Sequence, residues 1–306
     1  MLFEWAMVGL GWGSVLLFVG VSAGRILHWS RMPMNLRWEV YPVPNGSREK
    51  RRYGGSYMEE PDWARKRQAR PSILAELVEM GIEIFFFKRV REHNRYGLWP
   101  WTMALHWGTY LLLVWAGLLV VTSIPWGGLG QAEVITELVN RVGVVAFVLG
   151  ALGSLGLVIK RAGNADLRLY TAPVDYFNLL FMAAIFVSGL LSWLVDPALV
   201  SHRLYVGGVL AFSPAPIPFL TAALFLIFEL FLVYMPFSKL IHYFAKYFTI
   251  HRTLWEDRFK TKDSPVDRRV AEQLAYRVTW AGPHIVPGQT WLEEVHMPAV
   301  PQDGKK

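Results

Sequence analysis

Long apolar stretches separated by polar connections make up most of this chain. Apolar runs of about 18 residues or more are typical of helices that cross a membrane. Five such runs are present, at residues 5–27, 101–125, 138–159, 174–195 and 217–238. The first begins MLFEW, without a basic segment, so we interpret it as a membrane helix and not as a cleaved signal peptide. The pattern predicts an all-α membrane protein in which five transmembrane helices form a bundle.

The polar segments divide the chain into four parts. We expect a first transmembrane helix over residues 1–30 and an inner-side loop with an interfacial helix over residues 31–98. A four-helix transmembrane bundle is expected over residues 99–250, and an inner-side extended tail over residues 251–306. Residues 31–71 are polar and rich in Pro and Gly, which favours irregular structure. The tail has several Pro and mixed charge, so we expect it to lie along a partner rather than to fold as a large domain.

The end of the inner-side loop has the pattern of an amphipathic helix. Over residues 72–92, acidic residues come early and basic residues come late, which suits the helix dipole. An apolar stripe is formed by Ile73, Leu77, Ile84 and Phe87. These features predict a helix that lies in the membrane interface.

The basic residues are distributed by membrane side. Residues 31–98 contain 14 Lys and Arg, the segment 239–306 contains 11, and the connection 160–168 contains three. The other two connections contain only Arg141 and Arg203. The positive-inside rule then places the N-terminus outside and the C-terminus inside the cytoplasmic membrane of the cell. The net charge of +7 follows from this asymmetry and does not indicate nucleic-acid binding.

The absence of cysteine restricts the redox chemistry of the chain. It excludes disulfides, thiolate-bound iron–sulfur clusters and the covalent attachment of c-type haem. Of eight histidines, only His106 and His242 lie within or at the edge of the spans, both near the inner interface. Two histidines at one depth on two helices predict a bis-histidine haem b site, in which both bind the haem iron.

Neighbouring residues were assigned to this site by their spacing. Gly108 leaves room beside a porphyrin, and Lys239 and Lys246 share the helix face of His242 and reach the haem propionates. The alternative is that the histidines are interfacial residues and the lysines are snorkelling anchors. Glu229 is the acid deepest in a span, and it either relays a proton or pairs with a polar group between helices.

Several motifs resemble the gamma subunit of respiratory nitrate reductase. MPFSKLIH is similar to the motif of its last span, RYGLWPWTMALHWGTYLLL to its second span, and RLYTAPVDYFNLLFMAAIFVSGL to the entry of its fourth span. The stretches LRWEVYP and RYGGSYMEE resemble membrane cytochromes of sulfate-reducer transmembrane redox complexes, heterodisulfide reductase and the sulfite-reduction-associated complex. The resemblance covers residues 1 to about 250 and implies that His106 and His242 are the axial ligands of a b-type haem.

One departure from the family pattern concerns a second, outer haem. The positions of its ligands hold Ala116 and Leu224, which cannot bind iron. We therefore expect one haem, and a second would need ligands such as His28, His202 or a methionine. The space left near Ala116, Gly117 and Leu224 is a hypothetical quinone site, with Glu229 as its proton relay; otherwise electrons enter from another subunit.

The resemblance also implies a function and partners. A membrane cytochrome of this type passes electrons between menaquinone and an inner-side iron–sulfur subunit that resembles the catalytic subunit of heterodisulfide reductase. Other membrane subunits and an outer multihaem cytochrome c are further expected partners. A haem-free membrane anchor is the alternative. A transporter would need internal repeats or broken spans, whereas the spans show no clear repeat and the fifth is expected to be uninterrupted apart from Pro236.

Overall fold

The structure is a computed structural model with two compact units. It describes residues 2–33, 41–43, 57–59, 73–124, 133–251, 262–282 and 285–296. The first unit comprises residues 1–25 and 82–243, and the second comprises residues 26–81 and 244–306. The boundaries between them fall inside three helices, and each unit is described by itself below.

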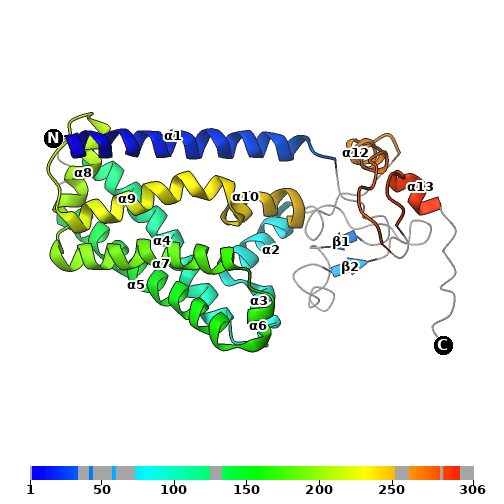
Figure 1. The fold of residues 1–306 in the computed structure, drawn as a ribbon, viewed down its shortest axis with the longest axis horizontal. Helices are drawn as coiled ribbons and strands as arrows, with labels where there is room; N and C mark the ends of the chain where they lie inside the picture. Colours follow the sequence, from blue (N-terminus) through cyan, green and yellow to red (C-terminus); the bar gives the residue numbers. More distant parts are fainter. Residues whose placement is uncertain are drawn as a thin grey trace. The chain divides into compact units, whose positions relative to one another are not determined.

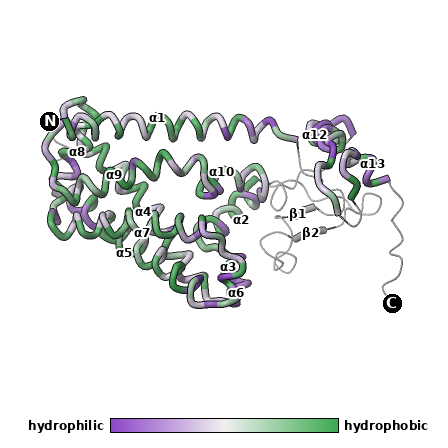
Figure 2. The backbone as a smooth tube through the Cα atoms, viewed as in Figure 1, coloured by the Kyte–Doolittle hydropathy of each residue, from purple (hydrophilic) through white to green (hydrophobic). Residues whose placement is uncertain are grey.

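The structure confirms the five expected spans. The helices long and apolar enough to cross a membrane are α1 (Leu2–Arg31), α4 (Trp99–Ser123), α5 (Glu133–Gly163), α7 (Pro173–Val195) and α9 (Phe219–Tyr234), the last continued to Phe237 by a 3-10 turn. Figure 2 shows apolar residues along these helices, whereas α12 (Pro265–Leu274) is mainly hydrophilic. The chain is therefore a helical, multi-pass membrane protein.

The core of the first unit lies between consecutive helices. α4 packs against α5, α5 against α7, and α7 against α9, so four spans lie side by side in chain order (Figure 1). The short helix α8 (Val200–Leu210) follows α7 and packs against α4. Large side chains fill the centre, among them Trp115, Phe147 and Phe186, which are almost fully buried. These contacts are those of a membrane bundle in which side-chain packing holds the helices together.

Glycines bring α4 and α5 into close contact. A Cβ atom on Gly153 would lie 2.1 Å from the backbone nitrogen of Leu105, and one on Gly108 would lie 2.4 Å from that of Gly150. Small residues at such positions let two helix backbones approach in a membrane. Gly108 therefore serves helix packing, and the expectation that it leaves room beside a porphyrin is corrected.

The predicted helix over residues 72–92 is divided by Phe87. α2 (Ile73–Phe86) and α3 (Lys88–Glu92) meet at this residue, whose φ of 50° lies in the left-handed region. The side chain of Phe87 is buried, whereas Ile73, Leu77 and Ile84 are exposed. The apolar stripe is thus confined to the exposed residues of α2, and Phe87 packs inward instead.

Aromatic side chains of α4 bind the end of α2. The indole Nε1 atoms of Trp99 and Trp107 donate to the carbonyls of Phe86 and Phe85, each at 3.0 Å, and the Tyr110 hydroxyl donates to that of Ile84 at 2.9 Å. The last carbonyls of a helix have no partner within it. These bonds therefore anchor the end of α2 to the second span.

The fifth span changes geometry before it reaches His242. α9 ends at Tyr234, and two 3-10 turns follow, η3 (Met235–Phe237) and η4 (Lys239–Ile241). Pro236 has no backbone N–H to donate to the preceding turn. Ser238 has an extended backbone, and its side-chain hydroxyl accepts a hydrogen bond from the N–H of Leu240 at 3.1 Å. His242 then begins α10 (His242–Lys246), after the end of the span, and the break in the span lies in the turn that contains Pro236, where the sequence predicts it.

The second unit combines small elements. β1 (Tyr41–Val43) pairs antiparallel with β2 (Tyr57–Glu59), with Pro42 opposite Met58, where irregular structure was expected. In the tail, α12 is followed by α13 (Trp291–His296), and an isolated bridge joins Arg277 to Thr290. The expected continuation of the loop and tail through residues 34–40, 44–56, 60–72, 252–261, 283–284 and 297–306 lies outside the described residues.

Candidate functional site

His106 lies in the second turn of α4 with its ring orientation fixed. Its Nδ1 atom lies 2.8 Å from the carbonyl oxygen of Thr102, one turn earlier. A carbonyl only accepts hydrogen bonds, so Nδ1 carries the proton in the neutral ring and Nε2 keeps its lone pair. This is the tautomer of a histidine that binds a metal through Nε2, with the other nitrogen held by a backbone carbonyl.

His242 has the same arrangement on a different element. Its Nδ1 atom lies 3.2 Å from the carbonyl oxygen of Lys239 in the preceding 3-10 turn. The same reasoning leaves the lone pair on Nε2. The turn that ends the fifth span thus supplies the acceptor that orients this ring.

The two rings lie at a separation that matches binding of one iron atom by both histidines. Their centres lie 6.2 Å apart, and their planes make an angle of 78°. A bond from a metal to an imidazole nitrogen is about 2 Å long. A five-membered ring with bonds of about 1.33 Å has its centre slightly more than 1 Å from each atom. Two such bonds in line place the ring centres about 6 Å apart, so the residues present fit axial ligation of one haem.

Aromatic side chains surround His106. The ring of Phe87 has its centre 4.4 Å from that of His106, and the ring of Tyr110 lies 6.3 Å away. Phe87 reaches this position because its left-handed backbone turns the chain between α2 and α3. This aromatic wall limits the contact of this side of the imidazole with water.

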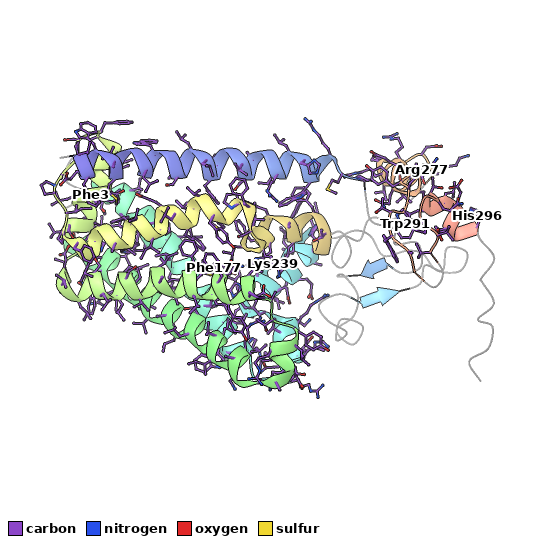
Figure 3. The ribbon with its side chains drawn as sticks, in the orientation of Figure 1. Phe3, Phe177, Lys239, Arg277, Trp291 and His296 are labelled. Carbon is purple, nitrogen blue, oxygen red and sulfur yellow. The ribbon has the colours of Figure 1, made fainter. Side chains whose placement is uncertain are left out.

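The lysines assigned to the haem propionates lie in different surroundings. Lys239, labelled in Figure 3, donates to Asp175 at 3.0 Å, close to the start of α7. Because Lys239 lies in η4 and not on a helix through His242, the expected shared face is not formed. Lys246 ends α10 and belongs to the second unit.

A cavity of about 250 Å³ lies at the expected position of the missing outer haem ligands. Ala116 and Leu224 both line it, together with Tyr205 and Glu229. Gly117 does not line this cavity, and a Cβ atom added to it would meet no atom within 4 Å. The hollow therefore lies beside Ala116, one residue from the expected glycine.

Glu229 is paired inside the bundle. Its side chain is 4% exposed, and its Oε1 atom accepts a short hydrogen bond from the Tyr205 hydroxyl. The same hydroxyl lies 3.2 Å from the carbonyl oxygen of Met7 in α1. The expected pairing of Glu229 with a polar group between helices is confirmed, and its role as a proton relay stays a prediction.

A buried polar cluster around His202 was not predicted from the sequence. Its Nε2 atom lies 2.9 Å from the Ser192 hydroxyl, and its Nδ1 atom lies 3.6 Å from Asp196. Thr221 lies 3.2 Å from Ser192 and 2.8 Å from Ser201, whose hydroxyl donates to Asp196 at 2.6 Å. Serines and threonines inside apolar helices were the available signal, because such side chains pair across helices.

The charges in this cluster differ between its two titratable residues. Burial lowers the pKa of His202 to about 4, although Asp196 opposes this shift. Burial works against the charge on Asp196, but hydrogen bonds from Ser201 and Val200 outweigh it, and the pKa of Asp196 is lowered. His202 is thus a fully buried core residue whose Nε2 atom is engaged by Ser192, and this contact makes it a poor second haem ligand. His28, the other alternative ligand, is exposed at the end of α1.

The described part of the chain was compared with three-ligand metal sites, and the whole chain with known proteins. Among the residues that the structure describes, no three His, Asp or Glu side chains converge on a point that could hold a metal ion. Axial haem ligation needs only two histidines, so this finding leaves the pair unaffected. The chain matches no protein-family model, no curated protein and no solved structure.

Proposed function

We propose that this chain is the haem b electron-transfer subunit of a membrane redox complex. The observation that supports it most directly is the pair of imidazoles with ring centres 6.2 Å apart, each with Nδ1 beside a backbone carbonyl. Thr102 and Lys239 orient the two rings, and His106 and His242 would hold the haem iron. A haem held by two histidines would supply one-electron transfer and not oxygen activation.

The electrons pass between the quinone pool, with menaquinone as the expected substrate, and an inner-side iron–sulfur subunit. The motif resemblance supports this pair of redox partners, and the charge distribution supports an inner side that carries residues 31–98 and 251–306. Their basic and polar surface is the docking region for a subunit that resembles the catalytic subunit of heterodisulfide reductase. Other membrane subunits and an outer multihaem cytochrome c complete the proposed assembly.

The optical spectrum of the purified protein tests this proposal. The chain is expressed with haem supplied, purified in detergent, and analysed by a dithionite-reduced spectrum and the pyridine haemochrome assay. A b-type α band with one haem per chain is the expected result. A folded, helical protein without the band would instead identify a haem-free anchor, the second candidate for a membrane subunit of this kind.

A further inference from the structure

The cavity beside Ala116 opens toward the lipid. It is lined by α1, α4, α8 and α9, all within the first unit, and its walls are almost entirely apolar. Val15 of α1 and Val120 of α4 line it and are also 44% and 40% exposed on the outer surface of the unit. A lipid-soluble molecule therefore has a route between these helices into the bundle.

The deep end of the cavity holds one acceptor that lacks a partner. Oε1 of Glu229 receives the Tyr205 hydroxyl, but Oε2 has no hydrogen-bond partner among the residues that the structure describes. The side chain is more than nine-tenths buried and lines the cavity. An unsatisfied acceptor at this depth is unfavourable, because lipid offers it no hydrogen bond. A ligand that donates there would remove this penalty.

Shape and chemistry together define the ligand. Apolar cavities of about 150 Å³ hold benzene, so the volume of about 250 Å³ here is sufficient for a larger aromatic ring. Phe225 and Phe228 line the walls and suit the faces of such a ring. The carboxylate requires a hydroxyl or N–H donor, which excludes a simple acyl chain as the specific ligand.

We infer that this cavity binds the head of a lipid-soluble hydroquinone, with one ring hydroxyl donating to Oε2 of Glu229. Tyr205 positions the carboxyl group by holding Oε1. When the carboxyl group is protonated, Oε2 becomes a donor and suits the carbonyl of the corresponding quinone. One side chain thus recognises both forms of the ligand through its own protonation state.

The position of the cavity agrees with electron transfer to the histidine pair, so this inference rests on the proposed function. Leu112 of α4 lines the cavity and lies six residues after His106. At about 1.5 Å per residue, this part of the wall lies about 9 Å along the helix from His106. Ala116, at the position of an outer haem ligand in the resembling family, lies about 15 Å along the helix by the same measure.

Binding of menadiol and menadione to the full chain tests the site independently of haem reduction. Affinities are measured by anaerobic calorimetry in detergent for the parent and for Ala116→Leu, with Gly117→Leu as the matched control on the neighbouring residue. We expect Ala116→Leu to weaken menadiol binding at least tenfold and Gly117→Leu to leave it unchanged, because only the former fills the cavity. No menadiol binding to the parent, or equal binding by both variants, overturns the proposal.

Glu229→Gln tests the role of the carboxyl group with little change in volume. Because Tyr205 donates to the Oε1 position, the glutamine oxygen occupies it and the amide NH₂ points into the cavity as a permanent donor. We expect the affinity ratio of menadiol to menadione to fall at least tenfold, whereas loss of packing alone would weaken both equally. An unchanged ratio contradicts the assigned contact.

Haem content separates a failure of this site from a failure of the proposed function. Haem per chain is measured by pyridine haemochrome in the same samples. If the parent binds menadiol more tightly than Ala116→Leu but holds no haem, the ligand site is supported and the proposed electron-transfer function is contradicted. If the parent holds haem but all variants bind menadiol equally well, the proposed function is supported and the ligand site is contradicted.

Discussion

The imidazole rings of His106 and His242 have their centres 6.2 Å apart, with an angle of 78° between their planes, although the two residues lie on different helices, far apart in sequence. Each ring is oriented by a carbonyl of its own segment: Thr102 in the first turn of α4 and Lys239 in a 3-10 turn. The two orientations therefore arise independently, and only the packing of the bundle brings the rings together. Substitutions at the rings and in the packing should consequently have separable effects.

Replacing either histidine should remove the same haem. His106→Ala and His242→Ala each delete one axial ligand, and we expect haem per chain to fall at least tenfold, since changes even to outer partners of metal ligands lower affinity about 10–100-fold. Pyridine haemochrome on the purified variants measures this loss. His93→Ala is the control, because His93 is exposed and its ring lies beside a carbonyl of its own helix. Full haem content in either ring variant would disprove the pairing.

The spans and the histidine pair were accessible from sequence for simple physical reasons. A run such as residues 174–195 must be helical in lipid, because lipid provides no partner for the backbone. The depth of His106 follows from its place in such a run. The close approach of the His106 and His242 rings, 6.2 Å between centres, could be expected only from matched depth together with the motifs. Depth alone does not determine which faces of two helices meet.

Other features depend on tertiary contacts that leave weak signals in sequence. Phe87 has the spacing of an apolar stripe but is buried on His106, because a left-handed residue ends the helix there. A glycine at position 108 is expected in sequence both where a helix faces a cofactor and where it packs closely on another helix. In the structure Gly108 faces α5. Lys239 was assigned a helical face that η4 does not provide. At Gly108 the predicted helix is present and only the neighbour differs, whereas at Phe87 and Lys239 the helix on which the prediction rests is not continuous.

The proposed topology predicts which segments a protease can reach. Residues 31–98 and 251–306 should be cut in sealed inside-out vesicles once the iron–sulfur partner is removed, because the positive-inside rule places them on the inner side. Immunoblots of the fragments locate the cuts. Right-side-out vesicles provide the comparison, and cleavage of these segments only in that preparation would reverse the orientation.

The contact between α4 and α5 predicts an intolerant glycine. Gly153→Ala places a Cβ atom 2.1 Å from the backbone nitrogen of Leu105, so the helices must separate. We expect a loss of about 1–3 kcal/mol or more of stability, as in other overpacked sites, measured as a lower Tm in detergent. Gly117→Ala is the matched control, because its added methyl group meets no atom within 4 Å. Equal Tm values for both variants would contradict the close approach.

The His202 cluster predicts a pH dependence of stability with a defined sign. The pKa of His202 is lowered by burial from 6.5 to about 4, so between these values the unfolded chain binds a proton that the folded chain does not. Stability therefore falls as the pH falls from about 6.5 to about 4, by about 3 kcal/mol at most from this residue. Asp196 faces His202 and, with its lowered pKa, adds a loss of the same sign at lower pH. Arg203, the other charged neighbour, opposes protonation of the ring.

Comparison of the parent with His202→Gln isolates the contribution of this ring from that of the other titrating groups. Tm values are measured in detergent at several pH values between 7 and 4. Glutamine has no proton to bind in this range, so the variant should lose less stability than the parent on acidification even though it is less stable at pH 7, where the bond to Ser192 is altered. Parallel curves for the two proteins would mean that the pKa of His202 is the same in the folded and the unfolded chain. Burial in the cluster would then not disfavour the charged ring, and the assigned origin of the acid sensitivity would be wrong.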